Sequence, residues 1–256
     1  MPSTITRLVP IPSEINVGVT SAKQATMLGL LGNPRSDYDD VCREVTNPTL
    51  KARITIANLG PFRVRGLAPA VTSLKEILAE IAVTQPDVHG ELGTAGMLCA
   101  RLVRGTTTHA ISNHSWGTAI DLTLDGVLDT RGDNLVQEGL TRIAPIFDRH
   151  GWFWGAGFRT EDAMHFEAGD DLIRKWHAEG EFGATPGLVP EALLMTGDRG
   201  AEVLALQRRL NALDAELEED GAFGTGTRAA VIAFQGANGL RPDGVVGAET
   251  RVALGF

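Results

Sequence analysis

Residues 112–121 read SNHSWGTAID, and this stretch decides how the surrounding chain is expected to fold. Gly117 lies between His114 and Asp121, and glycine tolerates the backbone angles of a tight turn. The run that starts at Ala119 is typical of a strand, in which successive side chains point to opposite faces. His114 and Asp121 are seven residues apart, which is too far for adjacent turns of one helix. We therefore predict that the chain bends at Gly117 and that the strand brings Asp121 near His114.

A second stretch, residues 162–167, reads DAMHFE and places a carboxylate, Asp162, three residues before an imidazole, His165. Together with His114 and Asp121, His165 would complete a set of two imidazoles and one carboxylate. Such a set is typical of catalytic zinc, because it leaves a fourth tetrahedral position open for water. Asp162 would then be placed to take a proton from that water.

Spacing alone leaves structural roles open for these residues. Asp121 can cap a turn, and Asp162 can be a solvated loop charge. Trp116 and the aromatic residues at 152–158 are typical of a core, although Ser112 and Trp116 are also candidates for contact with substrate. Four further histidines lack a partner at ligand spacing and are interpreted as structural, namely His89, His109, His150 and His177.

The composition suits one enzyme-sized domain and a smaller one within 256 residues. The apolar content of 43% and the charged content of 21% are typical of a globular protein with a packed core. The net charge of -9, without a clustered excess of Lys and Arg, argues against a nucleic-acid partner. No run of about 18 apolar residues occurs, so no membrane span is expected.

The hydrophobic pattern predicts an α+β fold for the larger part of the chain. Apolar residues recur at helical spacing over residues 69–85 and again over residues 135–150. Between them, the apolar runs at residues 97–103 and 119–124 favour strands. Helices interleaved with strands in this way indicate a single α+β core.

A stretch rich in proline and glycine divides the chain. We predict a catalytic domain over residues 1–178, a linker over residues 179–192 and a second domain over residues 193–256. The second domain contains helical periodicity and two similar turns, DGAFG at residues 220–224 and DGVVG at residues 243–247. A compact helical module is expected there.

The amino-terminal part indicates no function. Its turns are marked by Gly29, Gly32, Asn33 and Pro34. The spacing of Cys42 and Cys99 matches neither a disulfide framework nor a C-x-x-C metal motif, so both are predicted to be reduced, structural thiols. Residues 1–16 lack the continuous apolar segment of a secretory signal, so the protein is expected to be made in the cytoplasm. A monomer is the default expectation.

Two motifs in the first domain carry a family resemblance. Residues 112–121 fit S-x-H-x-x-G-x-A-x-D, and residues 162–167 fit D-x-x-H-F-E. In that order they resemble the zinc peptidases of the VanY and D-alanyl-D-alanine carboxypeptidase group, family M15. The resemblance covers roughly residues 93–167 and implies an α+β domain with a small antiparallel sheet flanked by helices.

The resemblance also implies roles for the site residues. The two histidines and the aspartate of the ligand set would bind one zinc ion per chain, and Asp162 would be the catalytic base. An arginine before the first motif would hold the substrate or stabilise the oxyanion. The segment at residues 97–105, MLCARLVRG, departs from the Ser-Gly-Tyr-Arg motif that is usual in the family. Arg101 is favoured over Arg104 for this role.

The carboxy-terminal part carries its own resemblance. TGDRG at residues 196–200, the two DG-x-x-G turns, and the pairs Leu206-Gln207 and Phe234-Gln235 recur in it. They resemble the three-helix peptidoglycan-binding domain that is often attached to wall hydrolases. The whole chain is therefore similar to a modular endolysin, with peptidoglycan as its partner.

The two resemblances imply a zinc-dependent peptidoglycan peptidase that cleaves the L-alanyl-D-glutamate bond of the stem peptide and so contributes to bacteriolysis. A D-alanyl-D-alanine carboxypeptidase is the alternative, although many such enzymes carry glutamate as the base. Two remote alternatives are a non-haem iron oxygenase, which uses the same ligand types, and an inactive wall-binding protein. The enzyme would act on the wall after release, through a holin if it is encoded by a phage.

Overall fold

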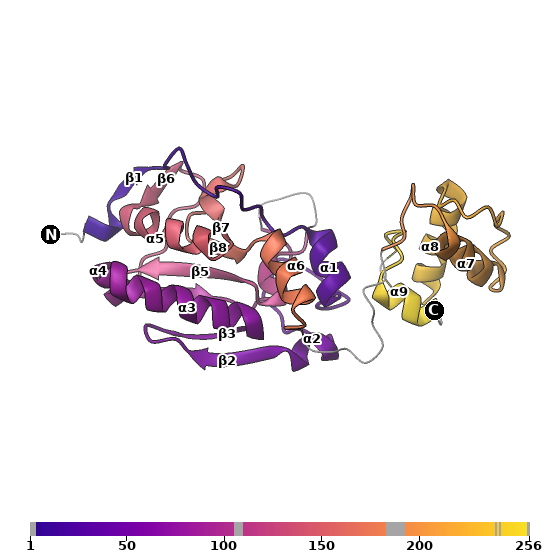
Figure 1. Cartoon of the computed structure of the whole chain (residues 1–256), viewed down its shortest axis with the longest axis horizontal. Coiled ribbons are helices and arrows are strands. Elements are labelled where there is room, and N and C mark those ends of the chain that lie inside the picture. The colour runs from indigo at the N-terminus through magenta and orange to yellow at the C-terminus, as the bar shows by residue number, and fades with distance from the viewer. Residues whose placement is uncertain (1–3, 105–109, 183–192, 239, 241, 255–256) are drawn as a thin grey trace. The chain divides into compact units, whose positions relative to one another are not determined.

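The computed structural model describes residues 4–104, 110–182, 193–238, 240 and 242–254. The chain forms two compact units (Figure 1). The first contains Met1–Met27 and Asn33–Thr185, and the second contains Leu28–Gly32 and Pro186–Phe256. Most of the predicted linker at residues 179–192 lies outside the described residues, so its bounds stay a prediction.

The first unit contains short strands and helices in alternation. Its helices are α1 (Gln24–Leu31), α2 (Pro48–Ala52), α3 (Ala68–Thr84), α4 (Pro86–Gly90), α5 (Glu138–Arg149) and α6 (Asp170–Ala178), with 3-10 turns η1 (Thr4–Thr6), η2 (Asn113–Trp116) and η3 (Gly155–Gly157). Its strands are β1 (Leu8–Pro10), β2 (Ile54–Asn58), β3 (Arg63–Leu67), β4 (Leu92–Gly96), β5 (Ala119–Leu124), β6 (Leu135–Gln137), β7 (Trp152–Trp154) and β8 (His165–Ala168). The predicted α+β class is confirmed.

The central sheet has four antiparallel strands in the order β4-β5-β8-β7. Because successive side chains in a strand alternate between faces, Ile120 and Phe166 share one face while Asp121 and His165 share the other. The ring of Phe166 lies 4.1 Å from that of Phe147 on α5. One face of the sheet is therefore packed against helices, and the other carries the predicted site.

Two smaller antiparallel pairs, β1-β6 and β2-β3, complete the first unit. Helix α3 joins the core through an apolar face that includes Leu74 and Ile77, and Ser73 on the same helix accepts a hydrogen bond from the indole of Trp152 at 3.0 Å. The helix predicted at residues 69–85 is confirmed as α3, which begins beside a proline and ends before Pro86.

Three predictions about local structure need correction. Residues 97–103 are not a strand, because β4 ends at Gly96, after a bulge and with φ 132°. Residues 135–137 form β6, so the helix predicted from residue 135 begins at Glu138. Gly29 lies inside α1 instead of marking a turn. Short apolar runs fit either a strand or a loop that packs on the core, and only tertiary pairing separates them.

A disulfide joins Cys42 to Cys99, so the prediction of reduced thiols is wrong. Their Cα atoms lie 5.1 Å apart, within the range that a disulfide spans. Arg43 and Ala100 exchange two backbone hydrogen bonds beside it, both at 3.1 Å. The two cysteines are 57 residues apart in the sequence, so no local motif indicates the disulfide. They come together only in the folded chain. The pairing fastens the segment that leads into Arg101.

The second unit contains α7 (Ala201–Asn211), α8 (Thr225–Ala237) and α9 (Ala248–Leu254) among its described residues, as predicted for a small helical domain. The helices surround an apolar core made of Leu194, Val203, Leu206, Leu210, Phe223, Val231, Val246 and Leu254. Of the residues that carry the resemblance, Leu206, Phe223 and Val246 belong to this core.

The two similar turns of the second unit are built by the same hydrogen bonds. Buried Gln207 donates to Asp220 at 2.7 Å and accepts from the backbone of Gly221 at 2.8 Å. Buried Gln235 donates to Asp243 at 3.0 Å and accepts from the backbone N–H of the following glycine at 2.9 Å. The repeated Gln and Asp residues therefore hold turns in place, because a buried amide needs its partners.

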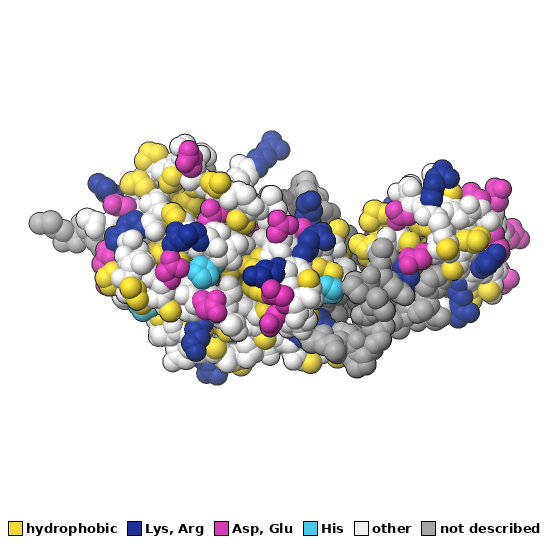
Figure 2. Space-filling view, in the orientation of Figure 1, with side chains coloured by type: hydrophobic (Ala, Val, Ile, Leu, Met, Phe, Trp, Pro, Cys, Tyr) yellow, Lys and Arg dark blue, Asp and Glu magenta, His cyan; other side chains and the backbone are white. Residues whose placement is uncertain are grey.

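On the face of the first unit shown in Figure 2, basic and acidic side chains are interspersed instead of gathering by sign. No continuous track of basic side chains is visible on this face. None of the helices in the described part of the chain has the length and apolarity needed to cross a bilayer.

Gly117 allows the end of η2 to lie close against the backbone of β3. It has φ 68°, in the left-handed region that favours glycine, as the predicted bend requires. A Cβ atom there would lie 2.8 Å from the backbone nitrogen of Leu67 and 2.9 Å from the Cα atom of Gly66. Because backbone atoms cannot yield as a flexible side chain does, any larger residue must displace η2 or β3.

We predict that Gly117→Ala lowers the free energy of unfolding of the first unit by about 2–5 kcal/mol, since left-handed strain and overpacking add. Gly126→Ala is the matched control, because Gly126 has φ 70° with open space around it, and strain alone should cost about 1–2 kcal/mol. Urea unfolding followed by tryptophan fluorescence reports on this unit, which holds all four tryptophans. Equal losses in the two variants would contradict the steric argument.

Candidate metal centre

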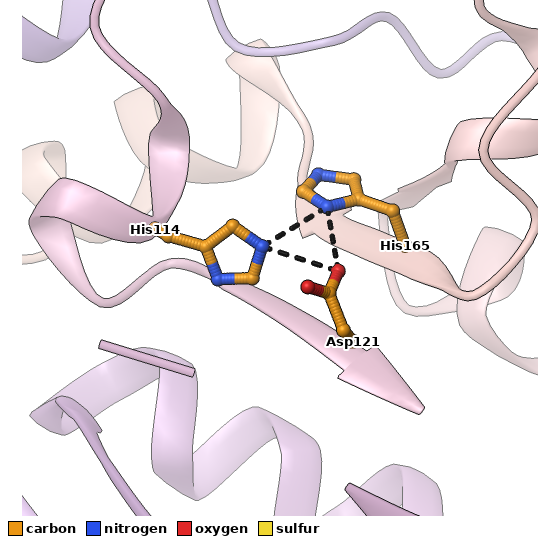
Figure 3. A group of neighbouring side chains, drawn as sticks. All are labelled: His114, Asp121 and His165. Carbon is orange, nitrogen blue, oxygen red and sulfur yellow. Dashed lines mark hydrogen bonds and ion pairs between the residues drawn. The ribbon is translucent and has the colours of Figure 1, made fainter. Parts of the chain in front are cut away.

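The three predicted ligands converge on one point (Figure 3). Asp121 on β5 and His165 at the start of β8 are direct cross-strand partners, and Asp121 Oδ1 lies 3.1 Å from His165 Nδ1. His114 on η2 points its Nε2 atom at both, 3.2 Å from each. Both imidazoles are buried and Asp121 is partly buried. The sequence prediction that the bend at Gly117 brings His114 to Asp121 is confirmed.

The outer nitrogen of each imidazole is already engaged. His114 Nδ1 lies 2.9 Å from the carbonyl oxygen of Met97, which can only accept, so this nitrogen is the donor. His165 Nε2 lies 2.9 Å from Glu167 Oε2, and donates in the same way to that carboxylate. In the neutral rings, the proton therefore sits on the outer nitrogen, and the inner nitrogen presents a lone pair.

This arrangement fits a metal ion. Two imidazole lone pairs and one carboxylate oxygen, 3.1–3.2 Å apart, repel one another unless a cation or a proton lies between them. The donor set of two nitrogens and one oxygen is one that zinc accepts in catalytic sites. His114, Asp121 and His165 are therefore the residues that would hold the ion.

The electrostatics of these side chains point the same way. Burial alone would lower the pKa of His165, but hydrogen bonds to Asp121 and Glu167 outweigh it and raise that pKa to about 10. Burial opposes ionisation of Asp121, yet hydrogen bonds from the two histidines hold its pKa well below the usual range. The site thus has a strong affinity for positive charge, for which a divalent cation would compete with the proton.

Glu167 is held as firmly as the ligand that it orients. The residue is buried, Ser21 donates to its Oε1 atom at 2.5 Å, and Asn113 donates to Oε2 at 2.9 Å. These donors hold the Glu167 carboxylate in place, and the carboxylate in turn orients the His165 ring. A carboxylate partner of this kind fixes the tautomer of a metal-ligating imidazole. The amino-terminal part, for which the sequence indicated no function, supplies Ser21.

Asp162 lies on the loop before β8. Its backbone N–H donates to the carbonyl of Gly155 at 3.0 Å, and its own carbonyl accepts from His165 at 3.0 Å. A Cβ atom on Gly155 would lie 2.4 Å from the Asp162 carbonyl oxygen, so the close packing of this loop requires glycine. Burial, with a smaller contribution from Asp121, raises the pKa of Asp162, while His165 and Arg131 oppose the rise.

The two candidate arginines differ in setting. Arg101 is partly buried, and burial together with Arg104 lowers the pKa of its guanidinium, while the nearby carboxylates of Asp121 and Asp162 oppose this change. Arg104 is exposed and donates to the carbonyl of Asp40 at 3.1 Å. Arg101 thus lies in the electric field of both acids of the site. Its role toward substrate stays a prediction.

Other predicted residues are placed away from solvent. Trp116 is fully buried and Ser112 is also buried, which favours a structural role over contact with substrate. Of the histidines interpreted as structural, His150 pairs with Glu80 at 3.0 Å, and His109 lies outside the described residues.

Comparison with known proteins agrees with the geometry. Residues 105–168 match the family model of the M15 type described as D-alanyl-D-alanine carboxypeptidase. Residues 199–254 match the model described as a peptidoglycan binding domain. The chain thus has one segment similar to M15-type peptidases and another similar to peptidoglycan-binding domains. The peptidase segment includes the three ligands and Asp162, whereas Arg101 and Arg104 lie before it.

Three solved structures are similar to limited parts of the chain. The crystal structure of the Burkholderia AP3 phage endolysin matches at 48% identity, with 25% of this chain and 24% of that chain covered and a TM-score of 0.24. The SleB N-terminal domain matches at 38% identity over 25% of this chain and 88% of that chain, with a TM-score of 0.24. A peptidoglycan-binding protein from Clostridioides difficile, in complex with glutamine hydroxamate, matches at 38% identity over 25% and 40%, with a TM-score of 0.25.

The chain thus spans about a quarter of the length of the endolysin that it matches. No curated protein matches the chain.

We predict that Glu167→Gln weakens zinc binding by about 10–100-fold, because the amide cannot supply the negative charge that orients His165 and raises its basicity. Competition with a chromophoric chelator measures the dissociation constant, and circular dichroism checks the fold. Glu179→Gln, at an exposed position after α6, is the matched control. Unchanged affinity in Glu167→Gln would show that His165 does not need this partner.

Proposed function

We propose that the chain is a zinc-dependent peptidase that cleaves the stem peptide of peptidoglycan at the L-alanyl-D-glutamate bond. The proposal rests on one observation, the convergence of His114 Nε2, His165 Nδ1 and Asp121 Oδ1 with both outer ring nitrogens engaged. Such a set binds zinc with an open coordination position. The matched peptidase and wall-binding families support peptidoglycan as the substrate.

A bound zinc ion would supply the Lewis acidity that activates water and polarises the scissile carbonyl. Asp162 would take the proton from the attacking water and deliver it to the leaving amine. Arg101 would offset negative charge as it develops on the carbonyl oxygen. Glu167 is an unsuitable base, because His165, Ser21 and Asn113 already engage its carboxylate.

The second unit would keep the enzyme on its substrate. A tethered wall-binding domain raises the effective concentration of the active site near the wall without adding contacts at the scissile bond. The disulfide between Cys42 and Cys99 favours action outside the reducing cytosol, where disulfides persist. Full-length Asp162→Asn protein that fails to sediment with insoluble peptidoglycan would contradict the anchoring role.

Cleavage of the terminal D-alanyl-D-alanine bond is the second candidate, because the matched family model carries that description. Mass analysis of fragments from purified peptidoglycan separates the two. Cleavage at L-alanyl-D-glutamate creates new amino-terminal D-glutamate, whereas carboxypeptidase action releases free D-alanine. If the zinc-loaded protein released neither product, the alternative of an inactive wall-binding protein would be favoured.

We predict that Asp162→Asn retains zinc and fold but lowers kcat on stem peptides by about 10²–10⁴-fold, because an amide of similar shape cannot take a proton at neutral pH. Zinc content and turnover are measured on the same preparation. Asp171→Asn, an exposed change at the start of α6, is the control and should turn over normally. Near wild-type hydrolysis by Asp162→Asn would assign the base elsewhere.

A further inference from the structure

The loop that carries Asp162 is clamped to a second loop, residues 129–134, by one buried carboxylate. Glu161 is 2% exposed. Its Oε1 atom accepts from the backbone N–H of Ala163 at 2.9 Å, on the Asp162 loop. Its Oε2 atom accepts from the backbone of Gly132 at 2.9 Å and of Asn134 at 3.3 Å, on the other loop. Glu161 therefore sets the distance between the two loops.

The second loop is shaped to receive this carboxylate. Gly132 has φ 85° and Asn134 has φ 60°, and these left-handed residues turn nearby N–H groups toward one point. Successive N–H groups in such a turn form a concave anion site. At the start of the loop, buried Asp129 accepts from the backbone N–H of Gln137 at 2.6 Å. The conformation of the loop is thus fixed at both ends by charged hydrogen bonds.

This clamp places Arg131 against Asp162. Arg131 Nε lies 3.4 Å from Asp162 Oδ2, and Arg131 Nη1 donates to the carbonyl of Arg104 at 3.2 Å. Glu161 directly precedes Asp162 in the sequence, and Arg131 directly precedes Gly132, to which the Glu161 carboxylate is bonded. Among the ion pairs of the described residues, Asp162 pairs with Arg131, and neither Arg101 nor Arg104 pairs with it.

We infer that Arg131 is a positioning residue that holds the Asp162 carboxylate in one orientation, with Glu161 holding Arg131 in turn. The inference rests on the proposed role of Asp162 as base. Arg131 engages Oδ2, which leaves Oδ1 as the oxygen for the proton. A base that is fixed in a productive orientation avoids the loss of rate that follows from a misplacement of about 1 Å. Arg131 acts through Asp162, without touching the substrate.

The test compares Arg131→Ala, Arg131→Lys and the double variant Arg131→Ala with Asp162→Asn, all in the zinc-loaded full chain. We expect Arg131→Ala to lower kcat by about 10–100-fold with KM unchanged within about twofold. Arg131→Lys should recover part of kcat, because it keeps the charge but loses the fixed fork. In the Asp162→Asn background, Arg131→Ala should have no further effect, as expected for residues that act as a unit.

Arg159→Ala is the matched control, because it removes an exposed arginine three residues before Asp162 and should leave kcat unchanged. Two readouts are independent of turnover. Zinc affinity should stay the same in all Arg131 variants, and a crystal structure of Arg131→Ala should show the Asp162 side chain in more than one rotamer. If Arg131→Ala fails to fold, Arg131→Lys and Glu161→Gln give the same comparison, and both should lower kcat without changing KM.

Several outcomes would overturn the inference. A rise in KM at constant kcat would show that Arg131 binds substrate. An equal loss of rate in the wild-type and Asp162→Asn backgrounds would show that Arg131 acts independently of Asp162. Unchanged kcat in Arg131→Ala, with Asp162→Asn inactive, would refute this inference alone. Wild-type turnover by Asp162→Asn would refute the role of Asp162, and the inference with it.

Discussion

Asp121 and His165 face each other across the antiparallel pair β5-β8, with the carboxylate 3.1 Å from the imidazole nitrogen. A shift of one residue in this register would turn one of them into the helix-packed face, because the side-chain period of a strand is two. The register is fixed by Ile120 and Phe166, which are buried on that opposite face. The core of the first unit therefore determines the geometry of the candidate metal centre, and the turn at Gly117 adds His114 to it.

The partners of this pair come from distant parts of the chain. Ser21 reaches Glu167 across 146 residues, and Met97 orients His114 across 17. Each ring has its outer nitrogen fixed, so the inner lone pairs need no rearrangement to receive an ion, which is how outer partners raise the affinity of a metal site. Segments far apart in the sequence thus orient the atoms of one small site.

The sequence predicted that His114, Asp121 and His165 would lie together, and it predicted the bend at Gly117 and helix α3, because local signals specify them. It failed where tertiary contact decides the outcome. Cys42 and Cys99 are joined because the folded chain brings the segment at Arg43 beside the segment at Ala100. The run at residues 97–103 makes only isolated bridges, Ala100 with Arg43 and Leu102 with Ile111, so it does not extend into a strand. Arg131 had no motif to mark it, since its contact with Asp162 depends on the clamp formed by Glu161.

The central claim is that one metal ion held by His114, Asp121 and His165 is required for hydrolysis of peptidoglycan. The most direct test titrates metal-depleted full-length protein with zinc while following both bound zinc and the amino termini released from purified peptidoglycan. The account predicts that both curves break at one equivalent of zinc, and that neither break occurs when His114 and His165 are replaced by alanine. Full hydrolysis by the metal-depleted protein, or a break that survives the double replacement, would contradict it.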